Sequence, residues 1–144
     1  MGAYPDREWA YCDCDSMIFW IFVVCAALTF LDASRAGHFK GVDPTAPIAE
    51  LAALWVPGAQ IVYIGKANLG ASGRRGLHKR LNEFRKYGVG VLVAHTGGRR
   101  TWQLVDHAQL IVGWRVTDDA EARPVERALI AVFYGALPCA NMND

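Results

Sequence analysis

Four polar residues, spread along the chain from residue 63 onward, have side chains suited to phosphate chemistry: Tyr63, Arg80, Glu126 and Asn141. Cleaving a phosphodiester requires a positive group near the phosphate, a positioner for water and commonly a hard divalent cation. Arg80 could supply a planar phosphate clamp, and Glu126 the one carboxylate for Mg²⁺ or Mn²⁺. Tyr63 could accept or relay a proton, provided that a nearby cation or metal-bound water lowers its pKa from the usual value of about 10.

The segment that delivers Tyr63 is short and apolar, and it reads Ile61-Val62-Tyr63-Ile64-Gly65-Lys66. Its β-branched residues predict a buried strand over residues 59–65. Gly65 leaves room for another backbone or a ligand to approach. We therefore expect Tyr63 and Lys66 at the exit of this strand, where polar groups can face a shared cleft.

Charge is distributed unevenly along the chain. The formal net charge is +1, yet residues 66–100 hold nine Lys or Arg against one acid, and the segments on either side are net acidic. Such a block is the electrostatic footprint of a phosphate-rich partner, DNA or RNA, although a solvated helix face would also explain it. Besides Arg80, the predicted nucleic-acid-binding residues are Lys66, Arg74, Arg75, Lys79, Arg85, Lys86, Arg99 and Arg100.

Two predicted helices carry the remaining site residues. The first runs from about residue 74 to 87 and has an apolar stripe at Leu77, Leu81 and Phe84, with most of the basic block on the sides of that stripe. The second runs from about residue 120 to 134 and carries Glu126. Asn141 follows it in an irregular tail.

The other predicted elements complete one small domain. We expect core strands at residues 17–25 and 110–116, and helices at 47–55 and 101–106. The chain length suits a single core, and the 53% apolar content argues against disorder. The prediction is therefore one α/β (α+β) domain over residues 17–144, with an inserted loop and helix at about 33–56 and a polar lead at 1–16.

Cysteine usage and one long apolar run bear on location. The four cysteines have no framework spacing, which favours free thiols in a reducing cytoplasm. Residues 17–31 carry no charge but are shorter than a bilayer span, and an acidic flank precedes them. A buried strand is the favoured interpretation, so a membrane partner is not expected; a membrane-associated N-terminus and an atypical leader stay as alternatives.

Taken together, these residues resemble the GIY-YIG nuclease superfamily. The resemblance covers roughly residues 18–144, and its motifs occur in the family's order. The matching segments are Val62-Tyr63-Ile64-Gly65-Lys66 for the YIG strand, His78-Lys79-Arg80-Leu81 for the arginine helix, Glu126, and Pro138-Cys139-Ala140-Asn141 for the closing asparagine.

The resemblance implies a small antiparallel three-stranded sheet flanked by helices, and a metal-dependent endonuclease that hydrolyses DNA. Glu126 would be the ligand of one Mg²⁺ or Mn²⁺, Arg80 would stabilise phosphate charge, Tyr63 would help to activate water, and Asn141 would support the site. No small-molecule cofactor is implied. The family's first motif should place a tyrosine on the first strand, but the corresponding stretch here is Ile18-Phe19-Trp20.

An indole can stack or donate a hydrogen bond, but it cannot act as an acid or base. The departure at Trp20 therefore motivates an alternative, a catalytically impaired nucleic-acid-binding module of the same fold. A third hypothesis is a membrane-tethered protein that uses residues 17–31 as an anchor. The sequence leaves the oligomeric state, the substrate structure and the biological pathway open.

Overall fold

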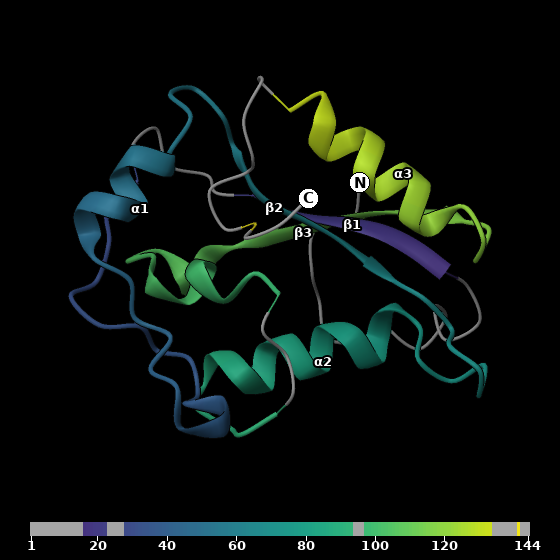
Figure 1. The fold of residues 1–144 in the computed structure, drawn as a ribbon, viewed down its shortest axis with the longest axis horizontal. Helices are drawn as coiled ribbons and strands as arrows, with labels where there is room; N and C mark the ends of the chain where they lie inside the picture. The colour runs from purple at the N-terminus through teal and green to yellow at the C-terminus, as the bar shows by residue number, and fades with distance from the viewer. Residues whose placement is uncertain (1–15, 23–27, 94–96, 134–140, 142–144) are drawn as a thin grey trace.

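The fold is a small sheet with helices on both faces (Figure 1). The computed structural model describes residues 16–22, 28–93, 97–133 and 141, with residues 16–22 described by their backbone alone. Within these ranges the sheet has three strands in the order β2-β1-β3, namely β2 (Ile61–Ala67), β1 (Ser16–Phe22) and β3 (Ile111–Thr117). Both strand pairs are antiparallel. The predicted mixed helix-and-strand class is confirmed.

The central strand, β1, comes from the apolar run at residues 17–31. Its register joins Trp20 to Ile64 on β2 and to Gly113 on β3, and it joins Ile21 to Tyr63. Within the described parts of the chain, no helix is long and apolar enough to cross a membrane. Residues 23–25, the end of the predicted strand, lie outside the described residues, as does the predicted polar lead up to residue 15.

Helix α2 (Leu77–Gly88) covers one face of the sheet. The predicted stripe of Leu77, Leu81 and Phe84 is buried in a core that also contains Tyr63 and Val112. The helix begins three residues later than expected because residues 70–73 form a turn, in which Gly70 and Gly73 have positive φ angles of 67° and 62°. A side chain would strain the backbone at both positions.

Helix α3 (Ala122–Ala131) covers the opposite face. Ala122 and Ile130 pack with Ile64 of β2 in a second buried cluster. The side chain of Ile64 thus faces α3, whereas that of its neighbour Tyr63 faces α2, as the alternation of side chains along a strand requires. Glu126 lies between the two buried positions of α3, at the margin of the second core.

A third helix, α1 (Ile48–Leu54), lies at one end of the molecule, close to the predicted range of 47–55. The buried Gln103 fixes the chain that leads to it. Its side-chain amide donates to the backbone oxygens of Leu31 and Ala46 and accepts from the backbone nitrogen of Ala46, at distances of 2.8–3.0 Å. Gln103 therefore ties the inserted segment to the domain.

The prediction of a helix at residues 101–106 is wrong. Two short 3₁₀ helices, η3 (Arg99–Gln103) and η4 (His107–Gln109), occupy this region, with Leu104 extended between them. Leu104 forms an isolated bridge with Phe30, and the backbone nitrogen of Val105 donates to Thr29 at 3.0 Å. Pairing with a segment distant in sequence thus replaces the helical hydrogen bonds that the local pattern favours.

Candidate functional site

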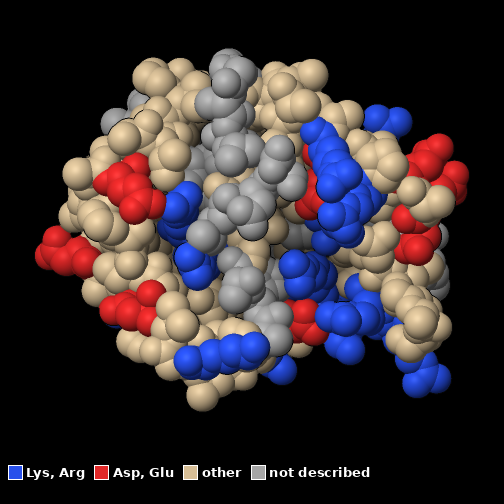
Figure 2. Space-filling model, viewed as in Figure 1, with Lys and Arg blue, Asp and Glu red and all other residues tan. Residues whose placement is uncertain are grey.

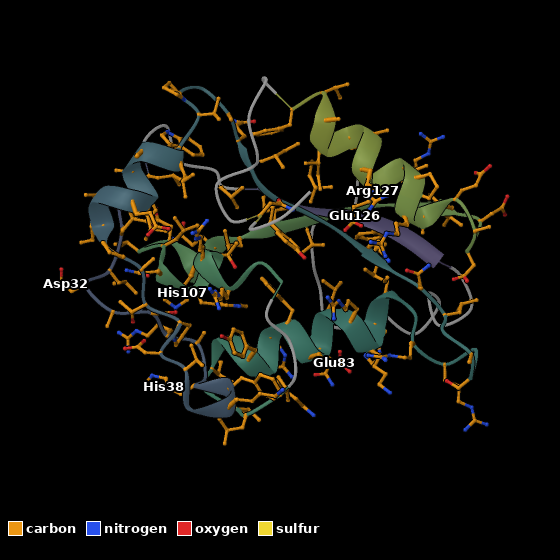
Figure 3. All side chains as sticks on the ribbon, viewed as in Figure 1. Asp32, His38, Glu83, His107, Glu126 and Arg127 are labelled. Carbon is orange, nitrogen blue, oxygen red and sulfur yellow. The ribbon has the colours of Figure 1, made fainter. Side chains whose placement is uncertain are left out.

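An open cleft of about 280 Å³ lies where β2, α2 and α3 meet. It contains three of the four residues predicted to do chemistry, Tyr63, Arg80 and Glu126. In Figure 3, Glu126 extends from α3, and Glu83 lies across from it on α2. The lining residues are Tyr63, Lys66, Ala67, Asn68, Arg75, Lys79, Arg80, Glu83 and Glu126.

Tyr63 lines the cleft, and its ring packs against two other segments. The ring stacks on Phe84 of α2 with centroids 6.3 Å apart and planes 8° apart. The backbone of the Gly97-Gly98 turn lies against it, since a Cβ atom added at Gly97 would come within 2.7 Å of the phenol oxygen. Tyr63 is only 6% exposed, so packing leaves its hydroxyl little freedom to move.

Arg80 is a charged neighbour of Tyr63 in the cleft. Its guanidinium lies beside the phenol, and it also lies 4.0 Å from the carboxylate of Glu83, one turn along α2. Burial raises the pKa of Tyr63, and the charge of Arg80 only partly offsets this. The phenol is therefore protonated at neutral pH, which is the opposite of what a general base needs.

Glu126 is a half-buried carboxylate surrounded by cations. Burial raises its pKa above the usual value, while four positive side chains act in the opposite direction. In order of effect these are Lys66 of β2, Arg123 of α3, Arg80 of α2 and Arg127 of α3. The immediate surroundings of Glu126 are therefore strongly positive, and they favour an anion.

A short hydrogen-bond chain positions Lys66 at the edge of the cleft. The ammonium of Lys66 donates to the side-chain oxygen of Asn68 at 3.0 Å. The amide nitrogen of Asn68 in turn donates to the carboxylate and the backbone oxygen of Asp119 at 3.2 Å, in the turn between β3 and α3. Sequence reasoning missed Asn68, although its place two residues after Lys66 at a strand exit was a usable signal.

Asn141 lies outside the cleft and acts on the backbone of β2. Its side-chain oxygen accepts from the nitrogen of Ile64, and its side-chain nitrogen donates to the oxygen of Ile64, both at 2.9 Å. The amide thus satisfies both polar groups of the residue next to Tyr63, as a neighbouring strand would. Its geometry fits the expected supporting role, and it brings no group to the cleft itself.

The basic block divides into residues that line the cleft and residues that do not. Lys66, Arg75 and Lys79 join Arg80 in the lining. Arg100 is instead paired with Glu50 of α1. Arg74, Arg85, Lys86 and Arg99 are also outside the lining. The contiguous sequence block is therefore not one contiguous surface around the cleft.

Sequence reasoning also missed two cations on α3. Arg123 and Arg127 lie three residues before and one residue after Glu126, and both are exposed. On a helix, this spacing makes Arg123 a neighbour of both Glu126, three residues on, and Arg127, four residues on. The helical spacing around Glu126 was a sufficient signal, but both arginines lie beyond the 66–100 block in a segment of negative net charge.

The cleft offers few protein ligands for a hard divalent cation. The described parts of the chain contain no group of three His, Cys, Asp or Glu side chains that could enclose a metal. Glu126 offers one carboxylate at a cleft open to solvent and substrate. Mg²⁺ is commonly held by one or two carboxylates, with waters and substrate phosphates as its other ligands. The donor set is compatible with such a cation only together with a phosphate.

Comparisons with protein-family models, with curated proteins and with solved structures give no significant match to this chain. The chemistry of the cleft is therefore the guide to its function. A buried phenol beside a guanidinium, next to a carboxylate with four cations around it, suits an anionic oxygen ligand better than an apolar one.

Proposed function

We propose that this protein is a metal-dependent endonuclease that hydrolyses DNA phosphodiester bonds in the cleft between α2 and α3. The observation that carries the proposal is the meeting of Tyr63, Arg80 and Glu126 in one cleft, although they lie on β2, α2 and α3. The order and spacing of these residues in the sequence also resemble those of the GIY-YIG nucleases. The cysteine pattern favours the cytoplasm as its location.

Arg80 and Lys66 bind the phosphate at the bond to be cleaved. A planar guanidinium can donate two parallel hydrogen bonds to phosphate oxygens, and it stabilises the charge that develops there during the reaction. Glu126 would hold one Mg²⁺ or Mn²⁺, and that cation would supply a Lewis acid and a water of lowered pKa. Asn141 fixes the backbone of β2 on which Tyr63 is placed.

Tyr63 acts as a neutral hydrogen-bonding group. Its raised pKa argues against removal of a proton from water by a tyrosinate at neutral pH. Its hydroxyl is a neutral group beside the Arg80 guanidinium, able to donate or accept a hydrogen bond but not to take a proton from water. The role differs from the proton acceptor expected from sequence, and it follows from the burial of the phenol.

Nicking of supercoiled plasmid in Mg²⁺ or Mn²⁺ tests this function. We expect the wild type to nick the plasmid and Glu126→Gln to lose the activity, because an amide is a poor ligand for a hard cation. Glu83→Gln is the matched control, since it removes a second cleft carboxylate that has no assigned role in catalysis. Equal nicking by the wild type and Glu126→Gln would contradict the proposed role of Glu126.

A second candidate function is a DNA-binding module that has lost catalysis. The observation that favours it is β1, which contains no tyrosine and places Ile21 opposite Tyr63. Salt-sensitive DNA binding by the wild type without nicking in either metal would select this alternative. Salt-sensitivity is the required signature because phosphate contacts release counterions.

A further inference from the structure

Two positively charged side chains of α3 lie near the single carboxylate of Glu126. Arg123 and Arg127 are exposed, and both act on Glu126 electrostatically. Among the described residues, neither arginine forms an ion pair within 4.0 Å. Arg123 and Arg127 act on the Glu126 carboxylate without forming an ion pair with it, so their charges are available to another anion.

The opposite wall of the cleft is also positive. Lys79 and Arg80 of α2 line it, together with Arg75 from the preceding turn. Figure 2 shows Lys and Arg side chains gathered over α2 and over α3, on either side of the cleft. Cations therefore line the α2 side of the cleft, while Arg123 and Arg127 lie outside the lining but close enough to Glu126 to act on its charge.

We propose that Arg123 and Arg127 form a second phosphate-binding wall, so that a DNA strand runs between α2 and α3 and contacts both. This inference rests on the proposed function and specifies how the substrate lies in that site. Consecutive phosphates of one strand repeat along its backbone, so a phosphate held by Arg80 has neighbours within reach of a second wall. A strand between the helices would place one phosphate beside Glu126 and a neighbouring phosphate on α3.

The salt dependence of DNA binding tests this arrangement directly. Binding of a short fluorescein-labelled DNA duplex, and of its separate strand, is measured by anisotropy in EDTA over a range of salt concentrations. The double variant Arg123→Gln/Arg127→Gln should bind more weakly. The slope of log K against log salt should fall by about 1.4 for the single strand and about 1.8 for the duplex, the values for two lost phosphate contacts.

The control is Arg35→Gln/Lys40→Gln, which removes the same charge from exposed positions in the inserted segment, outside the cleft lining. It should keep the wild-type slope. An unchanged slope in the α3 variant, or equal losses in both variants, would overturn the two-walled cleft while leaving the proposed function intact. A wild type that does not bind DNA would overturn both. If the double variant does not fold, the single variant Arg127→Gln takes its place. Its slope of log K against log salt should fall by about half as much.

Discussion

At the scale of single residues, the pair of Tyr63 and Arg80 is the most distinctive feature of the cleft. The ring of Tyr63 packs against Phe84 and the Gly97-Gly98 turn, and its hydroxyl lies beside the charge of Arg80. Packing therefore fixes the phenol beside the guanidinium of Arg80. The pair is a preorganised hydrogen-bonding unit, of the kind that stabilises charge developing in a transition state.

Removing the phenol oxygen should therefore affect catalysis more than folding. Tyr63→Phe keeps the ring packing, so we expect a loss of stability of about 1 kcal/mol, the usual value of one hydrogen bond. The cleavage rate should fall by at least about tenfold because the Arg80 guanidinium loses the hydroxyl beside it. Thermal melts and single-turnover cleavage would measure the two effects. A wild-type cleavage rate that climbs steeply towards pH 10 would contradict the neutral role of Tyr63.

The raised pKa of Glu126 predicts a pH-dependent stability difference. A carboxyl group whose pKa is higher in the folded state than in the unfolded state favours folding while protonated, and this contribution is lost as pH rises through the folded pKa. Glu126→Gln stays neutral throughout. Its melting temperature relative to the wild type should therefore increase as pH rises above the ordinary glutamate value of about 4.5, and stay higher at neutral pH.

Melting curves of both proteins from pH 4 to pH 8 would check this prediction. The same series on Glu83→Gln is the control. Glu83 is a second carboxylate in the cleft lining, and its replacement removes an ion pair with Arg80. A constant difference between Glu126→Gln and wild type at all pH values would show that the charge of Glu126 carries no cost in the folded protein.

At the scale of elements, the site depends on the attachment of a distant residue to β2. Asn141 makes two hydrogen bonds to Ile64 in a buried environment, and Ile64 packs against α3. Asn141→Ala would leave a buried backbone nitrogen and oxygen without these partners. We expect a loss of about 2–3 kcal/mol, measured by urea unfolding. Asn141→Asp keeps an acceptor oxygen for the backbone nitrogen of Ile64 but has no N–H to donate to its backbone oxygen, so this variant should also be destabilised.

Most elements could be predicted from local patterns. The stripe of Leu77, Leu81 and Phe84 gave α2, and the β-branched run around Tyr63 gave β2, because burial of one face leaves a periodic signal. The start of α2 was less predictable, since the turn at Gly70 precedes it. The 3₁₀ segments around Leu104 could not be predicted, because pairing with Phe30 determines them.

The candidate site follows the same division between local and tertiary information. Tyr63, Arg80 and Glu126 were found because their types and order suggested phosphate chemistry, and the structure brings them to one cleft. The protonated state of Tyr63 depends on burial by α2 and the Gly97-Gly98 turn, which no local pattern contains. Arg123 and Arg127 could have been found from their helical spacing around Glu126, but only folding brings α3 and the basic side of α2 to the same cleft residue.

At the scale of the whole molecule, nearly balanced charges hide a local field. The net charge is +1, yet four cations act on Glu126 in the cleft. Such a site repels a divalent cation until a phosphate neutralises part of the charge. We therefore expect Mn²⁺ to bind weakly to the free protein and more tightly to the DNA complex, with DNA affinity increased by Mn²⁺ to the same degree.

The paramagnetic resonance signal of free Mn²⁺ can measure this coupling, with uncleavable phosphorothioate DNA added or omitted. Glu126→Gln should lose the Mn²⁺ bound by the complex but keep DNA binding in EDTA. Equal affinity of the wild-type protein for Mn²⁺ with and without DNA would show that Glu126 and its neighbours form a complete metal site on their own.

The central claim is that Tyr63, Arg80 and Glu126 hydrolyse a phosphodiester in the cleft between α2 and α3. Single-turnover cleavage of labelled DNA, with wild type, Tyr63→Phe and Glu126→Gln compared at the same fraction of bound DNA, tests it most directly. We expect only the wild type to cleave efficiently, while all three proteins bind DNA. Equal cleavage by all three proteins, or no cleavage by a wild type that binds DNA in Mg²⁺ and in Mn²⁺, would contradict it.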